Sequence, residues 1–205
     1  MLNKLKFWQK KPAKTGQSFN LIITGFGGQG VITLADLVSK IALSQNYQVK
    51  QAELHGLAQR GGSVQAQVRF GQKVYSPKVK RGSADLVIAL DLLEAGRGCW
   101  WANPVQTIIL ADSEIFWPQE EKLDREKIIA DIKKFANEFK MVDASQKVKK
   151  LTGKDISTNI FLLATAIKNG FLPFKKEIAW QVISENLKPE FLEENKKVFG
   201  AAFSE

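Results

Sequence analysis

Residues 19–30, FNLIITGFGGQG, carry the main evidence for the fold. Residues 19–24 are mostly apolar and favour a strand, and residues 25–30 form a glycine-rich turn. Apolar residues then recur at helical spacing over residues 31–43. A strand, a G-x-G-x-x-G turn and a helix in this order are typical of a phosphate-binding site. The glycines let backbone N–H groups approach an anion, and the helix start adds about half a positive charge.

The spacing of the next two strands modifies this interpretation. Strands are predicted at residues 48–54 and 63–70, and Glu53 lies where a dinucleotide-binding fold has its ribose-binding acid. Taken by themselves, the turn and Glu53 indicate a binding site for NAD or FAD. However, only residues 55–62 separate the two strands, whereas consecutive parallel strands need a crossover of about a dozen residues or more. We therefore expect the strand at 63–70 to run antiparallel to a neighbour or to leave the parallel order.

The rest of the chain predicts a sheet covered by helices. Apolar runs at residues 85–90 and 105–110 fit central parallel strands. The other predicted elements are a hairpin strand at 73–76 after a turn at Gly71-Gln72, helices at 92–98, 124–139, 158–169, 175–186 and 189–203, and a strand at 141–143. The predicted fold class is α/β: a Rossmann-like, mixed, mainly parallel sheet with a β-hairpin insertion and a helical C-terminal third covering one face. We expect a basic arm at residues 1–17 and a single domain at 18–205.

The composition excludes several classes of protein. The longest apolar runs are under half of the roughly 20 residues that a membrane-spanning helix needs. A single cysteine, Cys99, and a single histidine, His55, exclude a disulfide, a Cys-rich zinc site and an iron–sulfur cluster held by this chain. Five charges of the net +9 lie in residues 1–17, and the remainder is too dilute to predict a nucleic-acid partner. No apolar signal segment follows the basic N-terminus, so we expect a cytoplasmic protein.

The glycine-rich turn and the loop at residues 55–62 are candidates for one site, because loops after neighbouring parallel strands meet at the same edge of a sheet. An arginine beside a helix N-terminus favours anions. The candidate cofactor-binding residues are Gly25, Gly27, Gly28, Gln29, Gly30, Gln59, Arg60 and Ser63. His55 is the one catalytic candidate, although a lone histidine is more often a satisfied loop residue, and no metal ligand is predicted. Arg60 equally fits an interface ion pair, and the glycines could merely permit close packing.

Two segments are similar to the gamma subunit, or gamma domain, of the 2-oxoacid:ferredoxin oxidoreductases. They are residues 25–31, GFGGQGV, and residues 53–64, ELHGLAQRGGSV. The second segment most resembles the short (beta) subunit of indolepyruvate:ferredoxin oxidoreductase. Ser83-Ala84-Asp85 and the helix at Asn159 also fall where that family has similar segments. The resemblance covers residues 19–190. The arm at residues 1–17 and the lysine-rich residues 147–154 depart from the pattern of the family.

The resemblance implies a subunit of a complex that oxidatively decarboxylates a 2-oxoacid to an acyl-CoA. In that family the complex uses thiamine diphosphate, Mg and iron–sulfur clusters, and passes electrons to ferredoxin. This chain lacks the thiamine-binding motif and the cluster cysteines, so it is expected to bind no cofactor tightly and to be inactive alone. It would pack against a larger subunit that binds thiamine and iron–sulfur clusters, and help to shape the coenzyme A entrance. The substrate would be an aryl-pyruvate such as indolepyruvate, or pyruvate.

Two other interpretations stay open on the sequence. The chain could be a free-standing Rossmann-like protein that binds NAD or FAD. It could also be a scaffold subunit whose glycine-rich turn binds nothing. The first alternative requires dinucleotide binding by the isolated chain, and the second requires that changes at Gly28 or Arg60 have no effect on the assembled complex.

Overall fold

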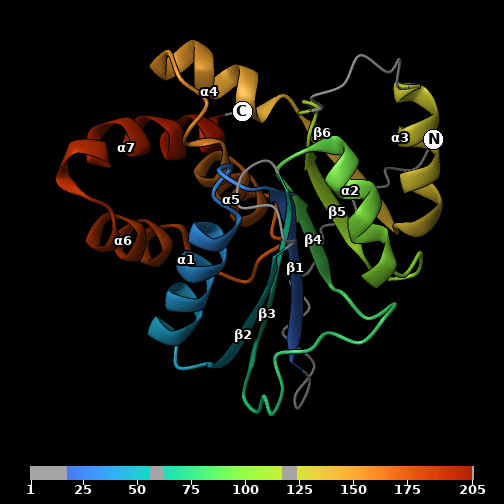
Figure 1. Cartoon of the computed structure of the whole chain (residues 1–205). Helices are drawn as coiled ribbons and strands as arrows, with labels where there is room; N and C mark the ends of the chain where they lie inside the picture. Colours follow the sequence, from blue (N-terminus) through green and yellow to red (C-terminus); the bar gives the residue numbers. More distant parts are fainter. Residues whose placement is uncertain (1–17, 56–61, 117–123, 205) are drawn as a thin grey trace, which may run out of the picture.

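A six-stranded sheet flanked by helices forms the fold (Figure 1). The computed structural model describes residues 18–55, 62–116 and 124–204. The strands are β1 Phe19–Phe26, β2 Gln48–His55, β3 Ser63–Gly71, β4 Leu86–Ala89, β5 Ile108–Asp112 and β6 Glu138–Val142. The helices are α1 Val31–Ser44, α2 Leu92–Gly98, the short 3-10 helix η1 Cys99–Trp101, α3 Arg125–Phe135, α4 Ala144–Thr152, α5 Thr158–Lys168, α6 Lys176–Asn186 and α7 Pro189–Ser204.

The strand that breaks the parallel order is β3. The strand order is β2-β3-β1-β4-β5-β6, in which β1, β4, β5 and β6 are parallel. β3 lies antiparallel to both of its neighbours, β1 and β2. The departure predicted from the short spacing at residues 55–62 is therefore confirmed, and β2 and β3 form an antiparallel pair. Phe26 pairs with Ser63, so the end of β1 lies beside the start of β3.

Residues 73–76 form no strand, so the prediction of a hairpin at Gly71-Gln72 is wrong. β3 already has β2 on one side and β1 on the other, and neither edge is free to pair with the segment that follows it. Side chains of the sheet hold that segment instead. Gln48 Oε1 accepts a hydrogen bond from Val74 N at 3.1 Å, and Gln67 Oε1 accepts one from Val79 N at 2.7 Å.

Helices cover both faces of the sheet (Figure 1). The face packed by α1, α5, α6 and α7 contains the larger core, and α2 and α3 pack on the other face. Successive residues of β1 alternate between the two cores, as the pleat requires: Leu21 and Ile23 face the larger one and Ile22 the smaller. The predicted cover of one face by the helical C-terminal third is confirmed. No helix in the described part of the chain has the length and hydropathy of a membrane span.

The helix predicted at residues 124–139 ends earlier than expected. α3 ends at Phe135, and Phe139 lies in β6, paired with β5. Thr107 O accepts a hydrogen bond from Asn137 N at 2.9 Å, which brings the chain onto the outer edge of β5. Apolar residues fit both the helical pattern and a strand, so the sequence pattern alone did not reveal this boundary.

A distant residue caps α4, a helix that the sequence did not predict. Asp112 Oδ1 accepts hydrogen bonds from Ala144 N at 2.9 Å and from Ser145 N at 3.3 Å. The side-chain cap therefore comes from the end of β5, and Asp143, the residue directly before the helix, makes no side-chain cap hydrogen bond. The strand predicted at residues 105–110 also began too early, because β5 runs from Ile108 to Asp112.

Candidate functional site

The two candidate loops meet at the edge of the sheet where β1 ends. Phe26 pairs with Ser63, and Gly27 N donates a hydrogen bond to Gly62 O at 2.9 Å. The expected convergence is therefore confirmed for the end of the second loop that the structure describes. His55 ends β2 at the same edge. Gln59 and Arg60 lie outside the described residues, and their place in the site stays a prediction.

The glycines of the turn have different roles. Gly28 and Gly30 adopt φ angles of +101° and +86°, which side-chain-bearing residues rarely adopt. A Cβ on Gly30 would lie 2.5 Å from Asn159 Nδ2 on α5, and a Cβ on Gly25 would lie 2.8 Å from Val31 Cγ2. In contrast, a Cβ on Gly28 would meet nothing within 4 Å. Gly25 and Gly30 therefore permit close packing, and the turn is open at Gly28.

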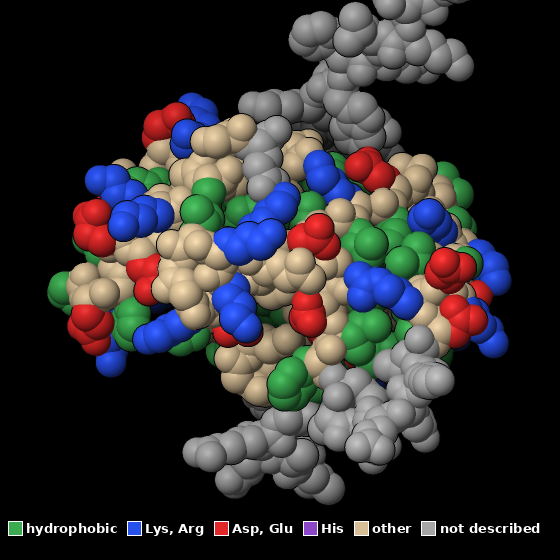
Figure 2. All heavy atoms as spheres, turned by 90° about the horizontal axis from the view of Figure 1, so that it is seen from above, with side chains coloured by type: hydrophobic (Ala, Val, Ile, Leu, Met, Phe, Trp, Pro, Cys, Tyr) green, Lys and Arg blue, Asp and Glu red, His purple; other side chains and the backbone are tan. Residues whose placement is uncertain are grey.

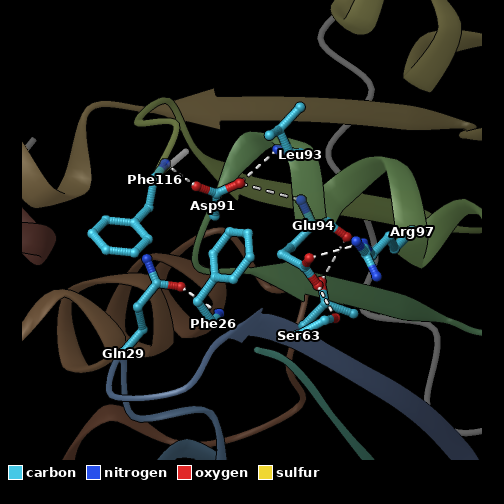
Figure 3. Close-up of polar contacts among 9 residues, drawn as sticks. Phe26, Gln29, Ser63, Asp91, Leu93, Glu94, Arg97 and Phe116 are labelled. Atoms are coloured by element: carbon cyan, nitrogen blue, oxygen red, sulfur yellow. Dashed lines mark hydrogen bonds and ion pairs between the residues drawn. The ribbon is translucent and has the colours of Figure 1, made fainter. Parts of the chain in front are cut away.

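Gln29 closes the turn with its own side chain (Figure 3). Its Oε1 accepts a hydrogen bond from Phe26 N at 2.8 Å, and its backbone N donates one to Phe26 O at 3.1 Å. The side-chain oxygen is thus used inside the turn. The side-chain amide nitrogen has no hydrogen-bond partner among the described residues, so it is the part of Gln29 left to contact a ligand.

The N-terminus of α1 presents unused hydrogen-bond donors at this edge. Its N-cap is Gly30, which supplies no side-chain cap, and the first turn contains no acidic residue. The backbone N–H groups of Val31, Ile32 and Thr33 precede the first helical hydrogen bond, from Leu34 N to Gly30 O at 2.9 Å. They have no partner within the part of the chain that the structure describes. Among the residues that the structure describes, no side chain or carbonyl group therefore neutralises the positive end of the α1 dipole.

Carboxylates occupy the starts of α2, which follows β4, and α4, which follows β6. Asp91, 1% exposed, accepts hydrogen bonds from Leu93 N at 2.7 Å and Glu94 N at 3.3 Å, and so caps α2. Its other oxygen accepts one from Phe116 N (Figure 3). Asp112 caps α4 in the same way. Burial raises the pKa of Asp91 even though these backbone donors oppose the shift.

An aromatic rim lies beside the turn. Phe26 is buried and Phe116 is 54% exposed, with 5.8 Å between the two ring centroids. Because Asp91 holds the backbone of Phe116, the same carboxylate that caps α2 also fixes this rim. Asp91, Glu94 and Phe116 were not predicted from the sequence. The signal that could have found Asp91 is its position directly after the buried strand at residues 85–90, at the edge where ligands bind in open α/β sheets.

The surface seen from above Figure 1 carries Lys and Arg side chains interspersed with Asp and Glu (Figure 2). No continuous basic stripe crosses the described residues in this view, in agreement with the dilute charge of the sequence. Within residues 18–55, 62–116 and 124–204, no group of three or more His, Cys, Asp and Glu side chains could hold a metal ion. Burial raises the pKa of Cys99 to about 11, so its thiol is protonated near neutral pH.

Asp112 yields a prediction on stability and pH. Burial raises the pKa of Asp112 above its ordinary value of 3.8, against the opposing hydrogen bonds to Ser145 and Ala144. The contribution of this group to stability is therefore full below pH 3.8 and is lost as the pH rises through the raised pKa. Asp112→Asn keeps an oxygen for Ala144 N but cannot ionise. Urea unfolding from pH 4 to pH 8 should show the variant gaining stability relative to the unsubstituted chain as the pH rises, and a difference independent of pH would contradict this.

Comparison with known proteins identifies the family. The family described as "Pyruvate ferredoxin/flavodoxin oxidoreductase" matches residues 20–205. The chain is similar to "Indolepyruvate oxidoreductase subunit IorB" of Pyrococcus horikoshii, with 32% identity over 193 residues, 89% of this chain and 93% of that protein.

Two solved structures share the fold. The keto/oxoacid ferredoxin oxidoreductase gamma subunit of Geobacter sulfurreducens has a TM-score of 0.66 at 20% identity, over 91% of this chain and 96% of that one. The 2-oxoglutarate:ferredoxin oxidoreductase of Magnetococcus marinus, solved with 2-oxoglutarate, coenzyme A and succinyl-CoA bound, has a TM-score of 0.69 at 15% identity, over 92% of this chain and 31% of that chain. The chain therefore belongs to the pyruvate ferredoxin/flavodoxin oxidoreductase family and is a gamma-type subunit of a 2-oxoacid:ferredoxin oxidoreductase.

Proposed function

We propose that this chain serves a complex that oxidatively decarboxylates a 2-oxoacid to an acyl-CoA, with an aryl-pyruvate as the favoured substrate. Indolepyruvate appears in the name of the P. horikoshii relative, which supports that choice. Thiamine diphosphate, Mg and the iron–sulfur clusters would be bound by a larger partner subunit, which passes electrons to ferredoxin. This division fits the residues present, because one cysteine cannot hold a cluster. The expected cytoplasmic location stays a prediction.

Within that complex, we propose that this chain binds the phosphates of coenzyme A. The proposed site, which we call the recess, is formed by the turn at residues 25–30 and the start of α1. The observation that carries the assignment is the unused set of N–H donors at the start of α1, beside the open position at Gly28. The starts of α2 and α4 cannot serve equally well, because Asp91 and Asp112 already occupy their donors. Arg60 would add a charge-assisted hydrogen bond from the second loop. Coenzyme A is bound in the M. marinus enzyme, which shares this fold over 92% of the present chain.

His55 has a smaller role in this proposal. It ends β2 at the edge where the two loops meet. The thiamine chemistry belongs to the partner subunit, and no proton transfer by this chain is needed for it. We therefore propose no catalytic role for His55.

The proposed function is tested by purifying the chain alone and with its partner. The chain alone should be colourless, should show no 2-oxoacid oxidation and should not bind NAD or FAD. Co-expression with a larger thiamine-binding, cysteine-rich subunit should yield a brown complex that reduces ferredoxin when given a 2-oxoacid and coenzyme A. Binding of NAD or FAD by the isolated chain, or an active larger subunit that never retains this chain, would contradict the proposal.

The dinucleotide alternative is not favoured by the topology. A nicotinamide-binding half needs three parallel strands joined by helical crossovers. Here β3 follows β2 directly and runs antiparallel to it. Glu53 is therefore not in the setting that a ribose-binding acid has in a dinucleotide fold.

The scaffold alternative differs from our proposal in one respect. It predicts that substitutions in the recess leave the affinity for coenzyme A unchanged, whereas our proposal predicts that they weaken it.

A further inference from the structure

Glu94 is a fully buried carboxylate in the first turn of α2 and lies at the junction of the two loops (Figure 3). Its Oε2 accepts a hydrogen bond from Ser63 Oγ at 2.7 Å. Its backbone oxygen accepts one from Thr24 Oγ1 at 2.9 Å. A single residue of α2 therefore contacts both β1 and the start of β3.

The position of Ser63 makes this contact relevant to the recess. Ser63 is the first residue of β3 and directly follows Gly62, whose carbonyl oxygen accepts from Gly27 N at 2.9 Å. It also pairs with Phe26, the last residue of β1. The place where the second loop leaves the sheet is thus set by Ser63. Since the Ser63 hydroxyl donates to Glu94, its proton is not free for a ligand, and the direct binding role predicted for Ser63 stays a prediction.

Burying the carboxylate of Glu94 at this position costs desolvation free energy. Burial raises the pKa of Glu94, and the hydrogen bond from Ser63 and the charge of Arg97 only partly oppose the shift. Arg97 Nε lies 2.9 Å from Glu94 Oε1, but its side chain is 60% exposed and water screens the pair. An apolar side chain of similar volume would avoid the desolvation of a charge, so a buried carboxylate is weak evidence for stability. What the carboxylate adds is a directional acceptor for Ser63.

We propose that Glu94 is a positioning residue for the recess: by holding Ser63, it fixes where the second loop leaves the sheet beside the glycine-rich turn. This inference rests on the proposed function. Glu94 touches no substrate in this account and acts through Ser63. It should therefore set the affinity of the complex for coenzyme A more than the rate of the chemical step.

The test compares four variants in the assembled complex, with calorimetric coenzyme A binding and steady-state kinetics. Ser63→Ala and Glu94→Leu should each weaken coenzyme A binding about tenfold and raise its KM similarly, with a smaller fall in kcat. The double variant should be no weaker than either single one, because both remove the same contact. Glu94→Gln keeps an acceptor oxygen for Ser63 and should restore binding to within about threefold of the unsubstituted complex.

A matched control separates positioning from general stability. Ser39 Oγ on α1 donates a hydrogen bond to Gln51 Oε1 at 2.6 Å, away from the junction of the two loops. Ser39→Ala should cost similar stability and leave the KM for coenzyme A unchanged.

The outcomes distinguish this inference from the proposed function. If Arg60→Ala weakens coenzyme A binding but Ser63→Ala and Glu94→Leu do not, the role of Glu94 is contradicted and the recess stands. If none of the three substitutions alters binding, the recess itself is contradicted. A Glu94→Gln variant as weak as Glu94→Leu, or a Ser39→Ala variant as weak as Ser63→Ala, would also overturn the positioning role.

Discussion

Gly30→Ala should destabilise the chain by about 2–4 kcal/mol, since a side chain at positive φ costs about 1–2 kcal/mol and a clash adds to it. Gly30 has φ +86°, and an added Cβ would lie 2.5 Å from Asn159 Nδ2 and 3.2 Å from Asn159 Cγ. Asn159 is buried at the start of α5 and donates to Gly30 O at 3.3 Å, so it cannot move away without losing that contact. Urea unfolding of the full chain measures the loss.

Two other glycines provide controls for Gly30. Gly28 has φ +101° but open space around it, so Gly28→Ala should show the backbone strain alone, about 1–2 kcal/mol. Gly200 lies inside α7 with nothing within 4 Å of an added Cβ, so Gly200→Ala should leave stability unchanged or raise it by about 1 kcal/mol. Equal losses for Gly30→Ala and Gly28→Ala would show that the contact with α5 is unimportant.

Phe70→Ala should cost about 3–5 kcal/mol, the usual loss for truncating a buried phenylalanine. Phe70 on β3 is 1% exposed. Its ring stacks on Phe19 with centroids 4.9 Å apart, and it also contacts Tyr47 at 5.6 Å and Phe174 at 5.2 Å. The residue therefore joins β1, the turn before β2 and the segment before α6 in the larger core. Equilibrium unfolding in urea of the full chain checks the prediction.

The control for Phe70 is Phe191, which is 42% exposed on α7. Phe191→Ala removes the same atoms from a partly solvated position and should cost under about 1.5 kcal/mol. A Phe70→Ala loss no greater than that of Phe191→Ala would mean that the aromatic cluster does not hold β3 in place.

Much of the fold was predictable because local patterns and spacing decide it. The run at residues 19–30 predicted β1, the turn and α1, and the structure has them in that order. The short spacing at residues 55–62 predicted the departure of β3 from the parallel order. The helices at 158–169, 175–186 and 189–203 were predicted to within one residue at each end. In these segments the 3.6-residue pattern and the punctuating Gly170 and Pro173 agree.

The errors occur where a distant group decides the local structure. Residues 73–76 have a strand-like sequence, but both edges of β3 are occupied. Phe139 fits the pattern of α3, but Thr107 draws the preceding residues toward β5. α4 receives its cap from Asp112, 32 positions before Ala144. None of these contacts leaves a signal in a short window of sequence.

The candidate site was predictable in its backbone and not in its supporting side chains. The glycines predicted the turn. The expected topology predicted that Ser63 lies at the same edge of the sheet, and the pairing of Phe26 with Ser63 confirms this. In contrast, the contact between Ser63 and Glu94 spans 31 positions and depends on how α2 packs on the sheet. The use of the Gln29 side chain inside its own turn was also not evident from the motif.

A calorimetric titration of the assembled complex with coenzyme A, comparing Arg60→Ala with Arg81→Ala, tests the recess most directly. Arg81 lies in the turn before β4, at the opposite edge of the sheet from the glycine-rich turn, and stacks over Trp100 at 3.9 Å. If the recess binds the phosphates, Arg60→Ala weakens binding about ten- to a hundredfold, as expected for a lost charge-assisted hydrogen bond, and Arg81→Ala leaves it unchanged. Unchanged affinity and turnover for Arg60→Ala would show that the glycine-rich turn and the second loop do not bind the phosphates of coenzyme A.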